Sequence, residues 1–139
     1  MDPQMNPRPK VRQRAKAVPF EFVLDGIARL DPVVRPMFGC SAVYVGPKIT
    51  FILRLKDDYI LDNGVWMATT LDHHESLKKE FPSMRSITVF GKGPTGWQVL
   101  PMDSADFEQS VQRACELVLK GDLRIGKIPK VRGPKKKKK

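Results

Sequence analysis

Short apolar runs alternate with turn clusters between residues 35 and 62, and this stretch predicts the centre of the fold. The runs are rich in β-branched and aromatic residues, and they cover positions 35–40, 41–45, 49–55 and 59–61. Gly46-Pro47 follows the second run and Asp57-Asp58 follows the third. Runs of this kind, divided by turn residues, are typical of an antiparallel meander.

The third run predicts how this sheet is covered. Ile49 and every second residue up to Leu55 are apolar. The residues between them are mixed, being Thr50, Ile52 and Arg54. Because successive residues of a strand point to opposite faces, we expect helices to cover one face of the sheet.

Apolar residues recur at helical spacing in two segments before residue 82. The first predicts a helix over about 20–30, which Asp31-Pro32 ends because the residue before a proline avoids the helical region. The second predicts a helix over 70–81, with Thr70 as its cap and Pro82 as its stop.

A third helical pattern, the clearest of the three, precedes the basic C-terminal segment. Its apolar stripe consists of Phe107, Val111, Ala114, Cys115, Val118 and Leu119. Asp103 or Ser104 is the expected cap, and Gly121 stands where a left-handed residue would end the helix.

Two more strands are expected on either side of a glycine-rich loop at 91–96. They cover 86–90 and 97–100, and a short apolar segment at 65–67 follows the Asn63-Gly64 turn signal. The order is helix, three or four strands, helix, two strands, helix. It predicts a two-layer α+β domain, in which helices pack on one face of an antiparallel sheet of about five or six strands.

Charge divides the chain into three parts. Residues 1–18 contain five basic side chains and one acidic one, and residues 122–139 contain nine and one. Residues 19–121 contain 11 basic and 13 acidic side chains, within a chain of net charge +10. We predict a disordered basic N-terminal tail, a folded domain and a disordered lysine-rich C-terminal tail, because such ends lack the apolar surface needed to fold.

These tails are the feature that indicates a partner. Lysine and arginine without interleaved aromatic residues bind phosphate by charge and counterion release, which gives affinity without sequence choice. The residues expected to contact nucleic acid are Arg8, Lys10, Arg12, Arg14, Lys16, Lys127, Lys130, Arg132, Lys135, Lys136, Lys137, Lys138 and Lys139. The alternative is a tail that only solubilises the protein, or that contacts acidic proteins or membrane surfaces.

No combination of residues predicts catalysis, a cofactor or a metal site. Residues 91–96 match the letters of the dinucleotide fingerprint, but a strand is expected after this loop, where the fingerprint needs a helix. His73 and His74 are adjacent, so on a helix they point about 100° apart and cannot chelate one ion together. We therefore expect a protein that is not an enzyme.

The two cysteines and the apolar runs predict the compartment. Cys40 and Cys115 match neither a zinc site nor a disulfide framework, which predicts two buried thiols in a reducing cytosol. No apolar run approaches the roughly 20 residues that cross a bilayer, and the N-terminus lacks the apolar segment of a signal peptide. We expect a cytoplasmic protein without membrane insertion.

One segment of the meander resembles a known family. Residues 34–39 read Val-Arg-Pro-Met-Phe-Gly and 42–45 read Ala-Val-Tyr-Val, and over about 20–120 the chain resembles the TfoX N-terminal domain family. Its later Trp-Gln-Val-Leu-Pro segment, followed by a helix, is also similar to the YjbR (MmcQ) family. Cys40 departs from the first family, which usually has a second glycine there.

The resemblance implies a small, non-catalytic α+β domain linked to the regulation of DNA uptake competence. Members of the TfoX family usually carry a helical domain after this one, and here a lysine-rich tail takes its place. The resemblance implies no catalytic residue.

Two functional hypotheses follow. The first is a regulatory or accessory protein whose basic tails bind nucleic acid without sequence preference, while the folded domain contacts a protein partner. The second is a YjbR-like protein- or ligand-binding module whose tails are incidental. Trp66 and Trp97 motivate the second, since tryptophan either packs in the core of the sheet or stacks on a ligand or base. Edge strands of a small sheet also allow a homodimer to form.

Overall fold

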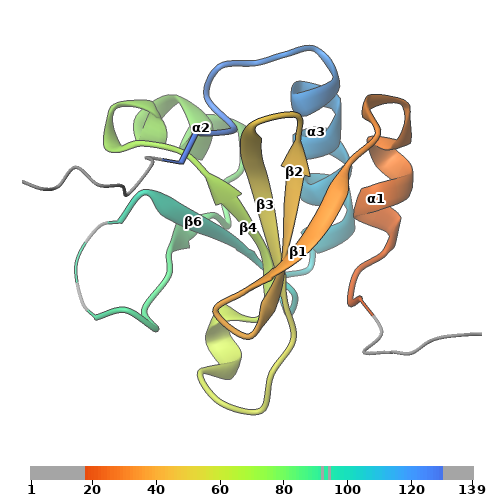
Figure 1. Cartoon of the computed structure of the whole chain (residues 1–139). Coiled ribbons are helices and arrows are strands. Elements are labelled where there is room, and N and C mark those ends of the chain that lie inside the picture. The colour runs from red at the N-terminus through yellow and green to blue at the C-terminus, as the bar shows by residue number, and fades with distance from the viewer. Residues whose placement is uncertain (1–17, 92, 94, 130–139) are drawn as a thin grey trace, which may run out of the picture.

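The computed structural model describes residues 18–91, 93 and 95–129 of the chain. A single antiparallel sheet forms its centre, with strand order β1-β2-β3-β4-β6-β5 (Figure 1). The strands are β1 (Val33–Met37), β2 (Cys40–Val45), β3 (Lys48–Arg54), β4 (Gly64–Ala68), β5 (Arg85–Ser86) and β6 (Trp97–Pro101). Every neighbouring pair is antiparallel, which confirms the predicted α+β class and a sheet of six strands.

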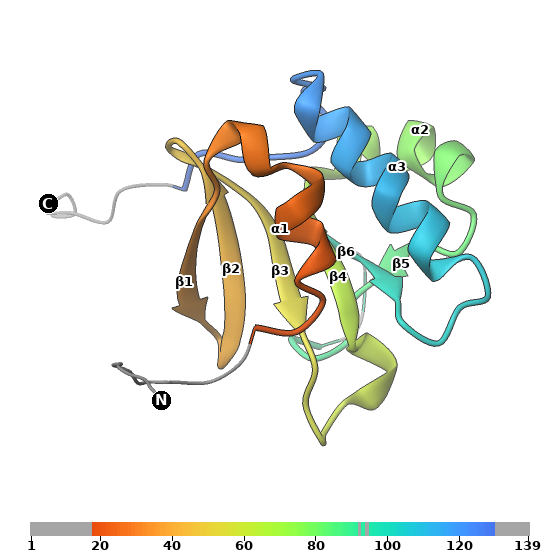
Figure 2. The same cartoon turned by 90° about the vertical axis from the view of Figure 1, so that its right-hand side faces the viewer.

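The described part of the chain also forms three α-helices and three short 3₁₀ helices. They are α1 (Phe22–Gly26), η1 (Ala28–Leu30), η2 (Ile60–Asp62), η3 (Leu71–His73), α2 (His74–Glu80) and α3 (Phe107–Leu119). Of these, η2, η3 and α2 lie between strands. Figure 2 shows α1 and α3 lying across the same face of the sheet. The predicted two-layer arrangement is therefore confirmed.

The main core lies between the sheet and this helical layer. Phe51, Leu53 and Met67 project from the sheet, and all three are fully buried against Leu77, Phe81 and the inner face of α3. On α3 the buried residues include Val111, Ala114, Cys115 and Val118, so the predicted apolar stripe is confirmed at these positions. Burial of a large apolar side chain stabilises a fold by about 1.5–3 kcal/mol, so this layer is the main source of stability.

The C-terminus of α3 ends as its sequence predicts. Gly121 has a φ of +76°, and its N–H donates to the Val118 carbonyl at 3.0 Å. The Asp122 N–H donates to the Leu117 carbonyl at 2.9 Å, which completes a Schellman motif. The N-terminal prediction is wrong, because α3 begins at Phe107 and Ser104 bonds to the Asp106 carboxylate instead of capping a backbone N–H.

A bulge in β3 changes the predicted division of its side chains. Val43 pairs with Phe51, but the next residue of β2, Tyr44, pairs with Ile49, so Thr50 is an extra residue in the ladder. The Thr50 hydroxyl donates to the Val43 carbonyl at 2.9 Å. Ile49 therefore lies with Ile52 on the face away from the helices, whereas Phe51 and Leu53 lie on the helical face. The prediction that Ile49 shares a face with Phe51 and Leu53 is wrong.

Three predicted elements differ in length or type. The helix over 20–30 is interrupted at Ile27, whose φ of −123° leaves the helical region after Gly26. The fourth run, 59–61, forms the 3₁₀ helix η2 instead of a strand, because Tyr59 is left-handed with a φ of +45°. The helix over 70–81 is divided into η3 and α2, and Thr70 bonds to the Asp72 carboxylate instead of capping a backbone N–H.

The predicted strand over 86–90 is also shorter, because β5 ends at Ser86. The backbone N–H groups of Thr88 and Val89 donate to the Asp62 carboxylate at 2.8 and 2.9 Å, so they are not available to a neighbouring strand. At Thr88 and Val89, hydrogen bonds to the Asp62 carboxylate therefore take the place of hydrogen bonds to a neighbouring strand.

The predicted start of the C-terminal tail at residue 122 is wrong for residues 122–129. Ile125 is 2% exposed and belongs to the main core. The Gly126 N–H donates to the Ala68 carbonyl at 2.7 Å, and Lys127 forms an antiparallel bridge with Ile49. Residues 122–129 therefore belong to the folded domain. The basic composition predicted a tail there because the segment contains a single buried isoleucine among charged residues. The predicted disorder of residues 1–17 and 130–139 concerns positions outside the described residues.

Candidate binding face

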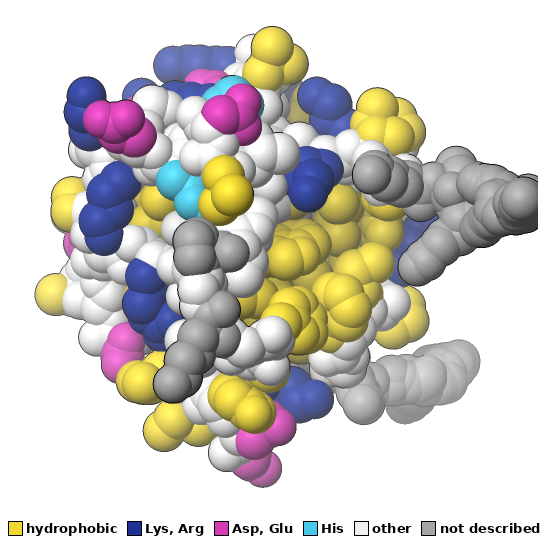
Figure 3. Space-filling model, turned by 90° about the vertical axis from the view of Figure 1, so that its left-hand side faces the viewer, with side chains coloured by type: hydrophobic (Ala, Val, Ile, Leu, Met, Phe, Trp, Pro, Cys, Tyr) yellow, Lys and Arg dark blue, Asp and Glu magenta, His cyan; other side chains and the backbone are white. Residues whose placement is uncertain are grey.

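The face of the sheet opposite the helices carries a row of aromatic rings. Phe38 and Phe90 meet edge to face with ring centroids 4.9 Å apart, and Phe90 meets Trp66 at 6.0 Å. Trp66 in turn contacts Trp97 at 5.9 Å. We call these four residues the aromatic row. Figure 3 shows the broad apolar surface that lies on this side of the molecule.

The rings at one end of the row are accessible to a partner. Phe38 is 54% exposed and Phe90 is 53% exposed, whereas Trp97 is half-buried and Trp66 is 1% exposed. Below the row lies a small apolar cluster that includes Ala42, Ile52 and Val99. The prediction that tryptophan packs against the sheet is confirmed for Trp66, and half-buried Trp97 packs against the same apolar cluster. The two phenylalanines are more than half exposed.

A tight turn places Phe38 on this surface. Met37 pairs with Cys40, so Phe38 and Gly39 form the two-residue loop between β1 and β2. Both have positive φ, +55° and +73°, as a hairpin turn of the primed type requires. A phenylalanine in this region is strained, so residues such as Asn or Gly would suit the turn better. The turn thus keeps an exposed aromatic ring at a local conformational cost.

A buried carboxylate holds the segment that carries Phe90. Asp62 is fully buried, and besides the two backbone N–H groups it accepts bonds from the Thr88 hydroxyl at 3.1 Å and the Arg85 guanidinium at 3.0 Å. Burial raises the pKa of Asp62, but the bonds from the Thr88 N–H and Arg85 outweigh it, so the pKa lies below its usual value. This ionised side chain therefore fixes the loop after β5, and Phe90 with it.

The two tryptophans are fixed by hydrogen bonds of their own. The Trp66 indole N–H donates to the Asp62 carbonyl at 2.8 Å, so the same residue positions Phe90 and Trp66. The Thr95 hydroxyl donates to the Trp97 carbonyl at 2.9 Å and accepts from the Trp97 N–H at 3.0 Å. The row is therefore built on backbone segments that are held in place, and the Trp66 ring is held as well, which lowers the entropy lost when a ligand binds.

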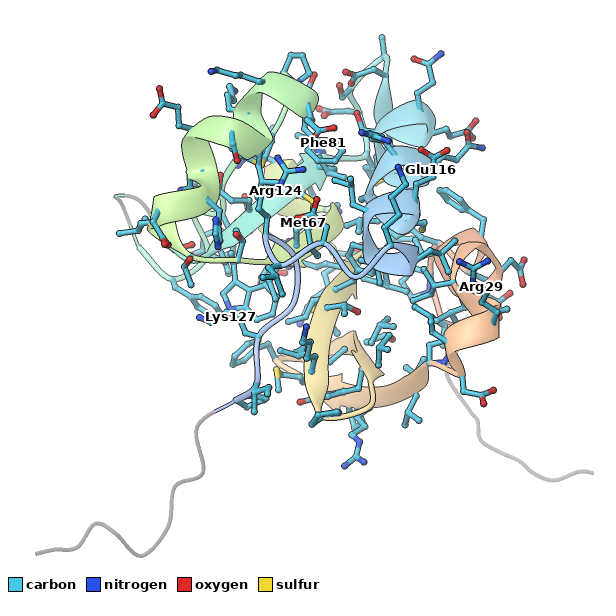
Figure 4. All side chains as sticks on the ribbon, turned by 90° about the horizontal axis from the view of Figure 1, so that it is seen from above. Arg29, Met67, Phe81, Glu116, Arg124 and Lys127 are labelled. Carbon is cyan, nitrogen blue, oxygen red and sulfur yellow. The ribbon has the colours of Figure 1, made fainter. Side chains whose placement is uncertain are left out.

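Two cations lie on the same face of the sheet as the row. The Arg35 guanidinium lies 5.4 Å from the centre of the Tyr44 ring on the same face, a cation–π contact. Lys127 is exposed, and its Nζ lies 3.5 Å from where a Cβ on Gly96 would stand, next to Trp97. Figure 4 shows Lys127 on the other side of the sheet from Arg29, which lies on the helical layer. Neither Arg35 nor Lys127 takes part in an ion pair between described residues.

Most other arginines of the folded body are engaged in ion pairs. Arg54 pairs with Asp58 at 3.1 Å, and Arg85 with Asp62. Glu80 of α2 joins Arg113 of α3 at 2.8 Å and Arg124 of the C-terminal segment at 2.5 Å; Figure 4 shows Arg124 beside α2. These cations stabilise the body and are less available to a polyanion. Of the predicted nucleic-acid contacts, the structure describes only Lys127, and the other 12 lie outside the described residues.

The residues weighed for catalysis do not converge in the described part of the chain. His74 begins α2, and burial lowers its pKa, which favours the neutral imidazole; its Nε2 is buried without a hydrogen-bond partner among the described residues. The glycine-rich loop connects β5 to β6, a strand, so the predicted hairpin is confirmed and the dinucleotide geometry is absent there. Within the described ranges, no group of three His, Cys, Asp or Glu residues could hold a metal ion.

Both cysteines are free thiols. Cys115 is buried in α3, and burial raises its pKa to about 11. Cys40 is only half-buried, so the prediction of two buried thiols is confirmed for Cys115 alone. Among the described residues, no helix has the length and apolar character needed to cross a membrane.

The fold and this face define a class: a two-layer α+β domain with one helix-covered and one aromatic sheet face. Comparisons with models of protein families, with curated proteins and with solved structures each found no match to the chain.

Proposed function

We propose that this chain is a non-enzymatic regulatory or accessory protein of the cytoplasm with a TfoX N-terminal-like folded domain, and that it binds nucleic acid through its basic ends. The division of charge carries the proposal. Residues 1–17 contain five basic side chains and residues 130–139 contain seven, against the single acidic Asp2. Lysines without aromatic neighbours attract any phosphate backbone by releasing counterions, so the expected binding does not depend on sequence.

The ion pairs within the folded body support this proposal. Arg54, Arg85, Arg113 and Arg124 are committed to ion pairs inside the domain. A domain that reads duplex DNA with its own surface usually presents a basic stripe. We therefore assign the long-range attraction of nucleic acid to the basic ends, and any contact that is specific for one partner to the folded body.

The experiment is a salt titration of duplex DNA binding by the full chain and two variants of equal net charge. In the tail variant, Lys136→Gln and Lys138→Gln remove two charges from the C-terminal end. In the control variant, Lys79→Gln and Lys120→Gln remove two exposed charges from the helical layer. The tail variant lowers the slope of log K against log salt by about 0.9 for each lysine that contacts a phosphate, and the control leaves it unchanged.

A slope that both variants change equally would contradict the proposal, because the ends would then act only through net charge. A full chain that binds no duplex at low salt would contradict it outright.

The second candidate is a protein- or ligand-binding module whose tails are incidental, and the exposed aromatic row is the observation that favours it. Phe38 and Phe90 present apolar rings on a held surface, which suits a partner of either kind. Tryptophan fluorescence with a metabolite panel, together with a pulldown, separates the candidates. A response there, without DNA binding, supports the module.

A further inference from the structure

We propose that the aromatic row binds the unpaired bases of single-stranded nucleic acid. The inference rests on the proposed function and adds to it: the basic ends hold the phosphate backbone, while the sheet distinguishes single strands from duplex. Proteins that bind single strands without sequence choice combine cations along the backbone with aromatic side chains on which successive bases stack.

The geometry of the row suits stacking. Its rings follow one another at centroid distances of 4.9, 6.0 and 5.9 Å, from the β1–β2 turn to β6. Trp66 is buried and supports its neighbours, so the rings that a base can reach are Phe38, Phe90 and Trp97. Phe38 and Phe90 are more than half exposed, and half-buried Trp97 lies at the other end. Asp62 and Thr95 hold the segments that carry Phe90 and Trp97 in place before any ligand arrives. A base therefore meets rings that need little ordering.

The charges around the row favour a polyanion over an apolar protein surface. Arg35 and Lys127 lie on the same face as the rings and take no part in ion pairs among the described residues. Lys127 is close to the end of the described residues, and the ten positions that follow Pro129 in the sequence contain seven basic residues. Interfaces between proteins are usually depleted of lysine, whereas this combination of rings and lysines is what a single strand requires.

The acidic residues near the row do not oppose this arrangement at the Lys127 end. Asp62 is fully buried and its carboxylate is neutralised by Arg85. Asp57 and Asp58 are exposed in the loop after β3, and Asp58 is paired with Arg54. The Lys127 end of the row is therefore where the backbone is expected to enter.

The test compares oligothymidine with a duplex of the same length for three forms of the full chain. The face variant carries Phe38→Ala and Phe90→Ala. The matched control carries Phe22→Ala and Leu123→Ala, which remove exposed apolar side chains away from the row, Phe22 on α1 and Leu123 after α3. Urea unfolding of each variant confirms that its domain is folded before binding is compared.

The expected result is selective. Wild type binds oligothymidine more tightly than duplex, and tryptophan fluorescence is quenched on binding. The face variant loses about five- to 150-fold in oligothymidine affinity for each ring that stacks on a base, while its duplex affinity stays within twofold of wild type. The control variant keeps both affinities.

Other outcomes separate this inference from the proposed function. Equal oligothymidine affinities for wild type and the face variant, with duplex binding intact, would overturn the stacking site and leave the basic ends in place. No binding to either nucleic acid would overturn both. A copurifying protein lost only from the face variant, with unchanged oligothymidine binding, would assign the row to a protein partner and overturn the inference.

Discussion

Replacing Asp62 by asparagine removes the charge that joins η2 to residues 85–89 while keeping the shape of the side chain. In the native domain, one carboxylate oxygen accepts from the Thr88 N–H, the Thr88 hydroxyl and the Val89 N–H, and the other accepts from Arg85. An amide offers only one acceptor oxygen. If it faces Thr88 and Val89, its NH₂ group points at the Arg85 guanidinium and that bond is lost.

The magnitude follows from these contacts. A hydrogen bond to a charged group contributes about 1.5–3 kcal/mol, and leaving a buried donor unsatisfied costs about 1–3 kcal/mol. The Arg85 side chain is 35% exposed, so water offsets part of its loss. We expect Asp62→Asn to lower the free energy of unfolding by about 2–3 kcal/mol. The matched control is Asp58→Asn, whose carboxylate pairs with Arg54 but is 64% exposed, and it should cost below about 1 kcal/mol.

The assay is urea unfolding followed by tryptophan fluorescence, which reports on Trp66, bonded to the Asp62 carbonyl, and on Trp97 together. It should be repeated from pH 7 to pH 3. Because the folded pKa of Asp62 is lowered, its stabilising contribution is present above its unfolded pKa near 3.8 and is lost as pH falls toward the folded value. The loss between pH 5 and pH 3 should therefore be smaller in Asp62→Asn than in wild type. Equal stability of the two asparagine variants at pH 7 would refute the reasoning.

Three further changes test other parts of the fold. Gly64→Ala should lower stability by about 3 kcal/mol or more in urea unfolding, because φ is +146° and a Cβ would collide with the Leu100 carbonyl; a loss below 1 kcal/mol would contradict this. Ile125→Ala should cost about 2–4 kcal/mol in thermal unfolding, and an unchanged Tm would show that residues 122–129 do not complete the core. Iodoacetamide at pH 8 should modify half-exposed Cys40 before buried Cys115, whose pKa is about 11, and mass spectrometry of the peptides would reveal the opposite order.

The sequence predicted the elements whose signals are local. The stripe on α3 comes from helical periodicity, β2 and β6 come from short apolar runs between turn residues, and Gly121 gives the helix end. The bulge at Thr50 could not be predicted, because it depends on how β2 and β3 pair after both have formed. Ile125 could not be predicted either, since its burial comes from contacts with the distant main core and leaves no periodic signal around it.

The aromatic row shows a similar limit for the site. Trp66 and Trp97 were singled out from the sequence as a stacking pair or as core residues, but Phe38 and Phe90 were not. Phe38 reads as one residue of a strand, and only the turn at Gly39 exposes it. The sequence also predicts Phe90 as a strand residue. In the structure the strand ends before it, because the Thr88 N–H donates to the carboxylate of Asp62, which lies 26 residues earlier in the chain. The row is assembled by tertiary contacts, so no spacing in the sequence reveals it.

The most direct measurement is the affinity of the full chain for oligothymidine across a salt series, with the tail variant and the face variant beside wild type. Loss of lysines from the end should flatten the dependence on salt, whereas loss of Phe38 and Phe90 should lower affinity at every salt concentration and keep the slope. A tail variant whose slope matches that of wild type would contradict the central claim that the basic ends hold nucleic acid.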